Sequence, residues 1–287
     1  MIQLTNDHVS LQILPELGGK ISSLVDRKTG REWLWTHPSL ERRPPVFAES
    51  FVENLDTGGW DEIFPSISPC ELPDSTRIPD HGDLVFLPAE VSDQSSHGLT
   101  LTTLTRSVRT RFVRKLLLDG RRLEIDYTLE SLDPRPIPYL WAAHPLIKLE
   151  DGMQLELPTD RLTASDGLEL TRTDDGGCRI LIQDPAKGVI EPHQLKFFTQ
   201  RGLAGWASLS ATDGSTLRFE WDPEKAPFFG MWLNQRSWYG SGSEPYFNLG
   251  FEPTTAPCDC LLEAINAKDH LTLAPGTTAS WKVTVLL

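Results

Sequence analysis

One glutamate and one histidine lie in apolar surroundings, where a proton acceptor and a proton donor are unexpected unless they do chemistry. Glu252 follows the small and apolar residues 247–251, and a carboxylate in such a run is expected to be paired or catalytic. His144 lies in the equally apolar segment 139–146, where burying an imidazole costs free energy unless it has a partner. Together they indicate general acid–base catalysis. The alternative for His144 is a structural histidine in the core whose hydrogen bonds are made within the protein.

A second histidine, His81, follows a proline-rich, strand-poor stretch between residues 42 and 79. Gly82 comes next and lets the backbone approach a ligand closely, and acidic residues flank the pair on both sides. A loop of this length inside a compact domain usually serves a functional site. We therefore expect His81 to bind the substrate, again with a structural histidine as the alternative.

Aromatic and acidic side chains in the middle of that stretch suit a sugar. Residues 57–65 combine a Gly-Gly turn with the ring of Trp60 and the carboxylate of Asp61. Aromatic rings stack on the C–H faces of sugars, and carboxylates accept hydrogen bonds from hydroxyl groups. We expect Trp60 and Asp61 to contact the substrate, with a core aromatic and a solvated acid as the alternative. Trp232 is a further candidate stacking platform, although a core position suits it better.

Charge and composition exclude several classes of protein. The net charge of −13, from 27 basic and 40 acidic residues, repels phosphate backbones, so no nucleic-acid partner is expected. No apolar run reaches the ~18 residues of a membrane-spanning helix, and residues 1–7 lack a signal-peptide pattern. Four cysteines are too few for a disulfide scaffold, and although Cys258 and Cys260 lie two residues apart, Cys70 and Cys178 have no His or Cys neighbour at ligand spacing, so we expect reduced thiols and no metal site. We expect a cytoplasmic protein, and both a monomer and a homodimer stay open.

The elements that must position these residues are short β-strands. Apolar and polar residues alternate over residues 9–14 and 20–25, which is the period of a half-buried strand. Further candidates separated by turn residues are 31–35, 99–104, 109–118, 122–130, 137–149, 153–157, 179–182, 205–209, 216–221, 228–233, 271–273 and 280–287. Helical periodicity is nearly absent, and residues 223–227 have room for one turn. We expect a single all-β domain over residues 1–287, with antiparallel sheets packed as a sandwich or barrel.

Several motifs, in order along the chain, resemble those of the aldose 1-epimerase (galactose mutarotase-like) family. They are the opening run 14–24, residues 59–65, the His-Gly pair at 81–82, the mid-chain His144, the late motif 249–253 and the closing residues 273–281. The resemblance spans nearly the whole chain and implies a β-supersandwich of antiparallel sheets without an organic cofactor. It also implies that Glu252 takes a proton from the anomeric hydroxyl, that His144 protonates the ring oxygen, and that His81 and Asp61 hold the sugar.

Two departures from the family pattern bear on the substrate. Alanines precede His144 where galactose-type members carry an asparagine, and a proline follows it. The arginine pair that brackets the His-Gly element in hexose-phosphate members is absent, because Asp80 and Asp83 take those places. A neutral aldose therefore fits the resemblance better than a sugar phosphate does.

The expected function is an isomerase of carbohydrate metabolism that interconverts the α and β anomers of a free aldose by acid–base ring opening. The first alternative is a non-catalytic carbohydrate-binding or sensing protein on the same scaffold. A polysaccharide lyase or hydrolase is the second, and it needs an extended cleft. Catalysis requires Glu252, His144 and His81 on one face, with acid and base several ångströms apart around a pyranose ring. It also predicts a bell-shaped dependence of kcat/KM on pH.

Overall fold

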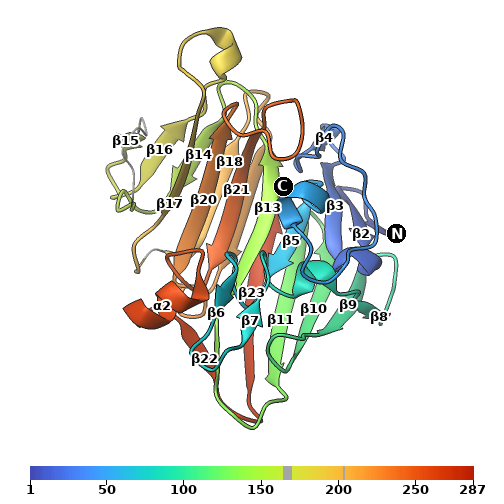
Figure 1. Cartoon of the computed structure of the whole chain (residues 1–287). Helices are drawn as coiled ribbons and strands as arrows, with labels where there is room; N and C mark the ends of the chain where they lie inside the picture. Colours follow the sequence, from blue (N-terminus) through green and yellow to red (C-terminus); the bar gives the residue numbers. More distant parts are fainter. Residues whose placement is uncertain (164–169, 203) are drawn as a thin grey trace.

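Two large antiparallel sheets dominate the structure, a computed structural model that describes residues 1–163, 170–202 and 204–287 (Figure 1). Among these residues, nine strands form the first sheet, here called the site sheet. In spatial order its strands are β1 (Ile2–Thr5), β2 (Val9–Leu14), β3 (Lys20–Asp26), β5 (Trp60–Ile63), β13 (Ala142–Lys148), β21 (Phe247–Thr254), β20 (Phe228–Gln235) and β17 (His193–Phe198), with β4 (Arg31–Glu32) paired to β3.

The second sheet, here called the backing sheet, lies behind the first in Figure 1. Its strands in the described part of the chain are, in spatial order, β15 (Leu170–Arg172), β16 (Cys178–Leu181), β14 (Gln154–Leu157), β18 (Trp206–Ser210), β19 (Thr216–Trp221), β23 (Thr278–Leu286), β11 (Arg122–Ser131), β10 (Thr110–Asp119), β9 (Gly98–Leu104) and β8 (Glu90–Ser92). The antiparallel all-β architecture expected from the strand pattern is thus confirmed.

Smaller elements complete the described chain. Two short ribbons pair β6 (Cys70–Glu71) with β7 (Arg77–Ile78) and β12 (Ile137–Tyr139) with β22 (Leu271–Leu273). The helices are α1 (Phe51–Asn54) and α2 (Leu261–Ala267), and the 3-10 turns are η1 (Pro15–Leu17), η2 (Leu84–Phe86) and η3 (Pro185–Lys187). Within the residues described, no helix is long and apolar enough to cross a membrane.

The hydrophobic core fills the space between the two sheets. Trp60 of β5 packs against Phe219 of β19 with ring centroids 5.2 Å apart, and Phe219 packs in turn against Phe251 of β21 at 5.0 Å. Successive side chains of a strand point to opposite faces, so the neighbours of these aromatics, Asp61 and Glu252, lie on the outer face of the site sheet. The core therefore fixes which side chains reach that outer face.

The sequence pattern missed elements at the centre of the site sheet. Strand β5 lies inside the stretch 42–79 that was expected to be strand-poor, and β17, β21 and helix α2 were not anticipated. The expected strand 137–149 is divided into β12 and β13. The expected turn at residues 223–227 is present, because the Ala226 amide donates to the Asp222 carbonyl.

A buried polar cluster joins the two sheets through Glu62. The hydroxyl of Tyr127 and the indole N–H of Trp141 each donate to its carboxylate at 2.9 Å, and Arg114 lies 3.4 Å away. Burial raises the pKa of Glu62 to about 7, against the opposing effect of Arg114. The folded protein therefore holds the Glu62 proton more tightly than the unfolded chain does.

This raised pKa predicts a specific dependence of stability on pH. The contribution of Glu62 protonation is complete below the unfolded pKa of 4.5 and is lost as the pH rises through about 7. Between pH 5 and 8 the wild type should lose on the order of 3 kcal/mol of unfolding free energy relative to Glu62→Gln, which does not titrate. Urea unfolding at several pH values measures this difference. Parallel curves for the two proteins would contradict it.

Candidate functional site

Glu252 is a fully buried carboxylate on the outer face of the site sheet. Lys196 of β17 places its Nζ 2.7 Å from Glu252 Oε2 and 3.0 Å from Asp259 Oδ1. Burial by itself lowers the pKa of Lys196, but the two carboxylates outweigh it and the pKa is raised. The lysine is therefore an ammonium ion, and it balances the charge of the buried Glu252 carboxylate.

The second oxygen of that carboxylate, Oε1, is left for a ligand. It is buried, and no residue in the described ranges forms a hydrogen bond with it. Gly250 provides its space, because a Cβ at that position would lie 2.6 Å from Oε1. A buried acceptor without a partner costs about 1–3 kcal/mol, so this oxygen suits a hydroxyl donor supplied by a ligand.

His144 lies beside Glu252 because β13 pairs with β21. Its Nε2 is 3.6 Å from Glu252 Oε1, just beyond hydrogen-bond length. This is closer than the several ångströms expected for two groups that straddle a sugar ring. Burial, followed by the charges of His81 and Lys196, lowers the pKa of His144 to about 3. At neutral pH the imidazole beside Glu252 is therefore neutral.

His81 reaches the same place from the loop after β7. Its backbone φ of 60° lies in the left-handed region, a strained conformation that often marks functional sites. The imidazole stacks on Phe51 of α1 with ring centroids 3.8 Å apart, and it meets the His144 ring edge-on at 5.5 Å. Its Nδ1 is 3.0 Å from Asp80 Oδ1, so a carboxylate and an aromatic ring both fix its orientation.

A cavity of about 240 Å³ opens between these side chains. Pockets for drug-sized ligands measure about 300–1,000 Å³, so this one suits a smaller molecule. Trp232 and Trp238 form an aromatic wall, with their rings edge to face at 6.1 Å. The remaining lining is Val52, Ile67, Ser68, Asp80, His81, His144, Lys196 and Asp259. Trp232 therefore faces the cavity and not the core.

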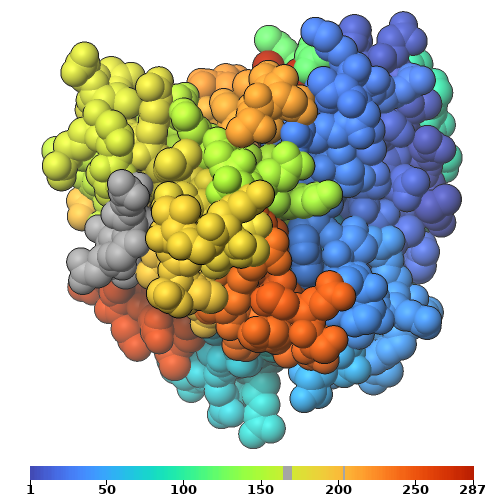
Figure 2. Space-filling model, turned by 90° about the horizontal axis from the view of Figure 1, so that it is seen from above, coloured from blue at the N-terminus to red at the C-terminus, as the bar shows by residue number. Residues whose placement is uncertain are grey.

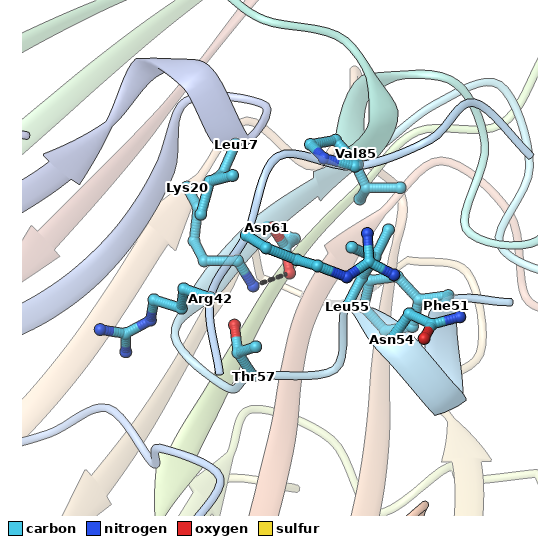
Figure 3. A pocket seen from close by; sticks show the side chains of 11 residues that line it. Leu17, Lys20, Arg42, Phe51, Asn54, Leu55, Thr57, Asp61 and Val85 are labelled. Carbon is cyan, nitrogen blue, oxygen red and sulfur yellow. Dashed lines mark hydrogen bonds and ion pairs between the residues drawn. The ribbon is translucent and has the colours of Figure 1, made fainter. Parts of the chain in front are cut away.

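Asp61 shares the outer face but does not line this cavity. It stands opposite His144 in the register of β5 with β13. Lys20 holds its carboxylate in a buried ion pair of 2.6 Å (Figure 3). The pair borders a separate hollow of about 10 Å³, which has room for about one water molecule. The ion pair engages Asp61 Oδ2 and fixes this carboxylate beside the small hollow, outside the lining of the larger cavity.

Trp60 is fully buried in the core and faces the backing sheet, contrary to the expectation that it contacts a ligand. The reason is the alternation along β5: since Asp61 points outward, its neighbour must point inward.

Comparisons with known proteins bear on the fold. A galactose mutarotase-like protein from Lactobacillus casei is 16% identical and superposes with a TM-score of 0.70, covering 100% of this chain and 99% of that one. A Klebsiella pneumoniae protein with a provisional assignment as an aldose 1-epimerase is 15% identical, with a TM-score of 0.73 over 98% of this chain and 77% of the other. A galactose mutarotase related enzyme from Lactobacillus acidophilus is 14% identical, with a TM-score of 0.68 over 99% and 96%.

The chain has the galactose mutarotase-like fold. Identity at this level establishes the fold alone, because one fold hosts many activities. Residues 1–68 also match the model of a domain of unknown function, DUF5107. No curated protein sequence matches significantly.

On this galactose mutarotase-like fold, three candidates from the sequence converge: Glu252, His144 and His81. Four other residues of the site were not anticipated: Lys196, Asp259, Trp238 and Phe51. A lysine at residue 196 carries no local signal, because its carboxylate partner lies 56 residues further along the chain. In the described part of the chain, no group of three His, Cys, Asp or Glu side chains is placed to hold a metal ion.

The electrostatic role of Lys196 can be tested through His144. Lys196→Met removes one of the charges that lower the pKa of His144, so the imidazole should titrate at a higher pH than in the wild type. Ring ¹⁵N chemical shifts of His144 measure this change. Lys225→Met, at an exposed position, is the matched control and should leave His144 unchanged. An unaltered His144 titration in Lys196→Met would show that the two groups do not interact.

Proposed function

We propose that the protein is an aldose 1-epimerase-like isomerase that interconverts the α and β anomers of a free aldose. The observation that carries the proposal is the unpaired oxygen of the buried Glu252, which lies 3.6 Å from the imidazole of His144, and His144 lines one small cavity. His81 and the tryptophan wall supply the polar and stacking contacts that a sugar ring needs. The fold and the ordered motifs are consistent with this function.

In the proposed reaction, Glu252 Oε1 accepts the proton of the anomeric hydroxyl. The electrons of that O–H bond form the C1 carbonyl while the C1–O5 bond breaks, and the ring oxygen leaves with the bonding pair. A proton delivered by His144 then gives the open-chain hydroxyaldehyde. Rotation about C1–C2 and reversal of these steps close the ring on the other face of C1, and the protein returns to its starting state.

The neutral state of His144 determines how that proton arrives. An imidazole with a pKa of about 3 is neutral at neutral pH, so it lacks the second ring proton that an imidazolium acid would give. Glu252, however, gains the anomeric proton during the same reaction and lies 3.6 Å from His144 Nε2. A short movement brings the two groups into contact, so the proton can pass from O1 to O5 through Glu252 and His144. This relay needs no proton from solvent.

The charges around the cavity favour a neutral sugar. Asp80, Asp259 and Glu252 carry three negative charges near the ligand, and Lys196 supplies one positive charge. A phosphate or carboxylate on the substrate would be repelled by this excess. The preference for a neutral aldose, inferred above from the missing arginines, thus has independent support.

A carbohydrate-binding or sensing protein is the second candidate, and one observation favours it. Lys196 already occupies one oxygen of Glu252, and this ion pair gives the carboxylate a role in the site that needs no proton transfer. Kinetics separate the two functions, because a binder does not accelerate anomer exchange.

The principal prediction concerns three single variants and one double variant. Glu252→Gln and His144→Asn should each reduce anomer exchange by about a hundredfold or more while sugar binding persists, because acid–base groups typically contribute 10²–10⁴-fold. The double variant should lose little beyond either single variant, because each group depends on the other. His81→Ala should mainly weaken binding. Saturation-transfer NMR measures exchange and calorimetry measures binding.

The matched control for these variants is Glu224→Gln, which alters an exposed glutamate and should leave exchange at the wild-type rate. If no aldose in a panel of neutral sugars exchanges faster with the wild-type protein than without it, the proposed isomerase activity is refuted.

The low pKa of His144 also revises the expected pH profile. Because this imidazole is neutral throughout the neutral range, kcat/KM should show no alkaline limb from its deprotonation between pH 6 and 8. We expect a plateau there and a fall only at acid pH, once spontaneous mutarotation has been subtracted. An alkaline limb near pH 6.5 that disappears in His144→Asn would show that His144 works as an ordinary imidazolium acid.

A further inference from the structure

Buried amide groups without partners gather at one end of β20 and β21. Asn234 and Asn248 are both fully buried. Neither amide atom of Asn248, nor the Nδ2 of Asn234, has a hydrogen-bond partner among the residues described. The two residues stand directly opposite each other in the register of the strands, so their side chains share one face and are neighbours.

These amides lie on the same outer face as the candidate acid–base pair. Asn248 precedes Glu252 by four residues, a separation of ~14 Å at the rise of an antiparallel strand. Trp232 stands opposite Gly250, midway between the two positions. The outer face therefore presents a carboxylate, an aromatic ring and a pair of amides in a row.

The loop between β20 and β21, residues 236–246, covers the amides. The backbone N–H of Trp238 donates to Asn234 Oδ1 at 3.2 Å, and the Trp238 side chain lines the 240 Å³ cavity. The indole N–H of Trp238 is also buried without a partner in the described ranges. Trp238 thus separates the cavity from the amide pair.

The loop is held at its ends and contains glycine and serine in between. Arg236 donates to Asp184 at 2.5 and 2.9 Å, and the Tyr246 hydroxyl donates to Asp56 at 3.0 Å. The intervening residues 237–245 include two glycines and three serines. Seen from above, the orange segment around residue 240 lies at the surface between yellow and blue segments (Figure 2). Inside the loop the Tyr246 amide donates to the Trp238 carbonyl at 2.8 Å, so uncovering the amide pair requires this bond and the bond from Trp238 to Asn234 to break.

We propose that Asn234 and Asn248 form the floor of a second saccharide subsite, which Trp238 covers in the free protein. An unpaired buried polar group costs about 1–3 kcal/mol, and an amide offers the donor and the acceptor that sugar hydroxyls match. One ring at Glu252 does not reach the amides, but two linked rings do. The ligand is therefore a reducing disaccharide with its anomeric end at Glu252, which rests on the function proposed above.

The test compares monosaccharides with disaccharides that carry the same reducing end. Calorimetry is run with glucose, maltose and cellobiose, and with further neutral hexoses and their reducing disaccharides. The wild type should bind at least one disaccharide about tenfold more tightly than its monosaccharide. A tenfold gain in affinity corresponds to the net contribution of one or two hydrogen bonds. Asn248→Leu should bind the monosaccharide within about twofold of wild type and lose the disaccharide advantage. Asn266→Leu, on the exposed face of α2, is the control.

A second variant and a second readout keep the proposal testable if Asn248→Leu does not fold. Asn234→Leu should lose the same advantage. Hydrogen exchange of residues 236–246 should become faster on binding the disaccharide, which moves Trp238 off the amides, and should not become faster on binding the monosaccharide, which packs against Trp238.

The outcomes separate this subsite from the proposed activity. A disaccharide preference that depends on Asn248, in a protein without anomer exchange, supports the subsite and refutes the isomerase. Equal affinity for both sugars, or an Asn248→Leu variant that is more stable and keeps the preference, overturns the subsite and leaves the amides as a site for buried water. If no sugar of either kind binds, both proposals fail.

Discussion

The alternation of side chains along paired strands is the constraint on which the rest of the structure depends. On β21 it sends Phe251 into the core and Glu252 to the outer face, and on β13 it brings His144 to the same face. A slip of one residue in either strand would bury the chemistry between the sheets and expose the core aromatics. Packing in the core thus fixes the site indirectly, because each aromatic side chain that packs there makes the next residue of its strand point outward.

The carboxylate of Glu252 on that face is buried, and Lys196 of the same sheet supplies its counter-charge. A buried ion without a counter-charge is costly, and the ammonium group of Lys196 bridges Glu252 and Asp259 at 2.7 and 3.0 Å. The same cation contributes to keeping His144 neutral. The site therefore contains a buried carboxylate, a neutral imidazole and a lysine whose charge acts on both. A proton relay from one sugar oxygen to the other fits this state better than an imidazolium acid does.

The sequence predicted the parts of this site in which a polar residue lies within an apolar segment. Glu252 and His144 were identifiable as polar groups in apolar segments, and the half-buried strands of the backing sheet were identifiable by their alternation. Strands β5 and β21 were missed because every residue in them is buried, so no alternation of polarity marks them. Trp60 was wrongly expected to contact the substrate because β5 was not predicted as a strand. In a strand, an outward Asp61 requires an inward Trp60. Lys196 has no local signal, because only the fold brings it to Glu252.

The proposed function requires the cavity to hold a sugar whose anomeric centre faces both Glu252 and His144. The most direct measurement is a crystal structure of the protein soaked with a neutral aldose that it binds. We expect the anomeric oxygen within hydrogen-bond distance of Glu252 Oε1, the ring oxygen toward His144 Nε2, and the ring against Trp232. A sugar bound in the cavity with its anomeric carbon turned away from Glu252, or bound elsewhere on the protein, would contradict it.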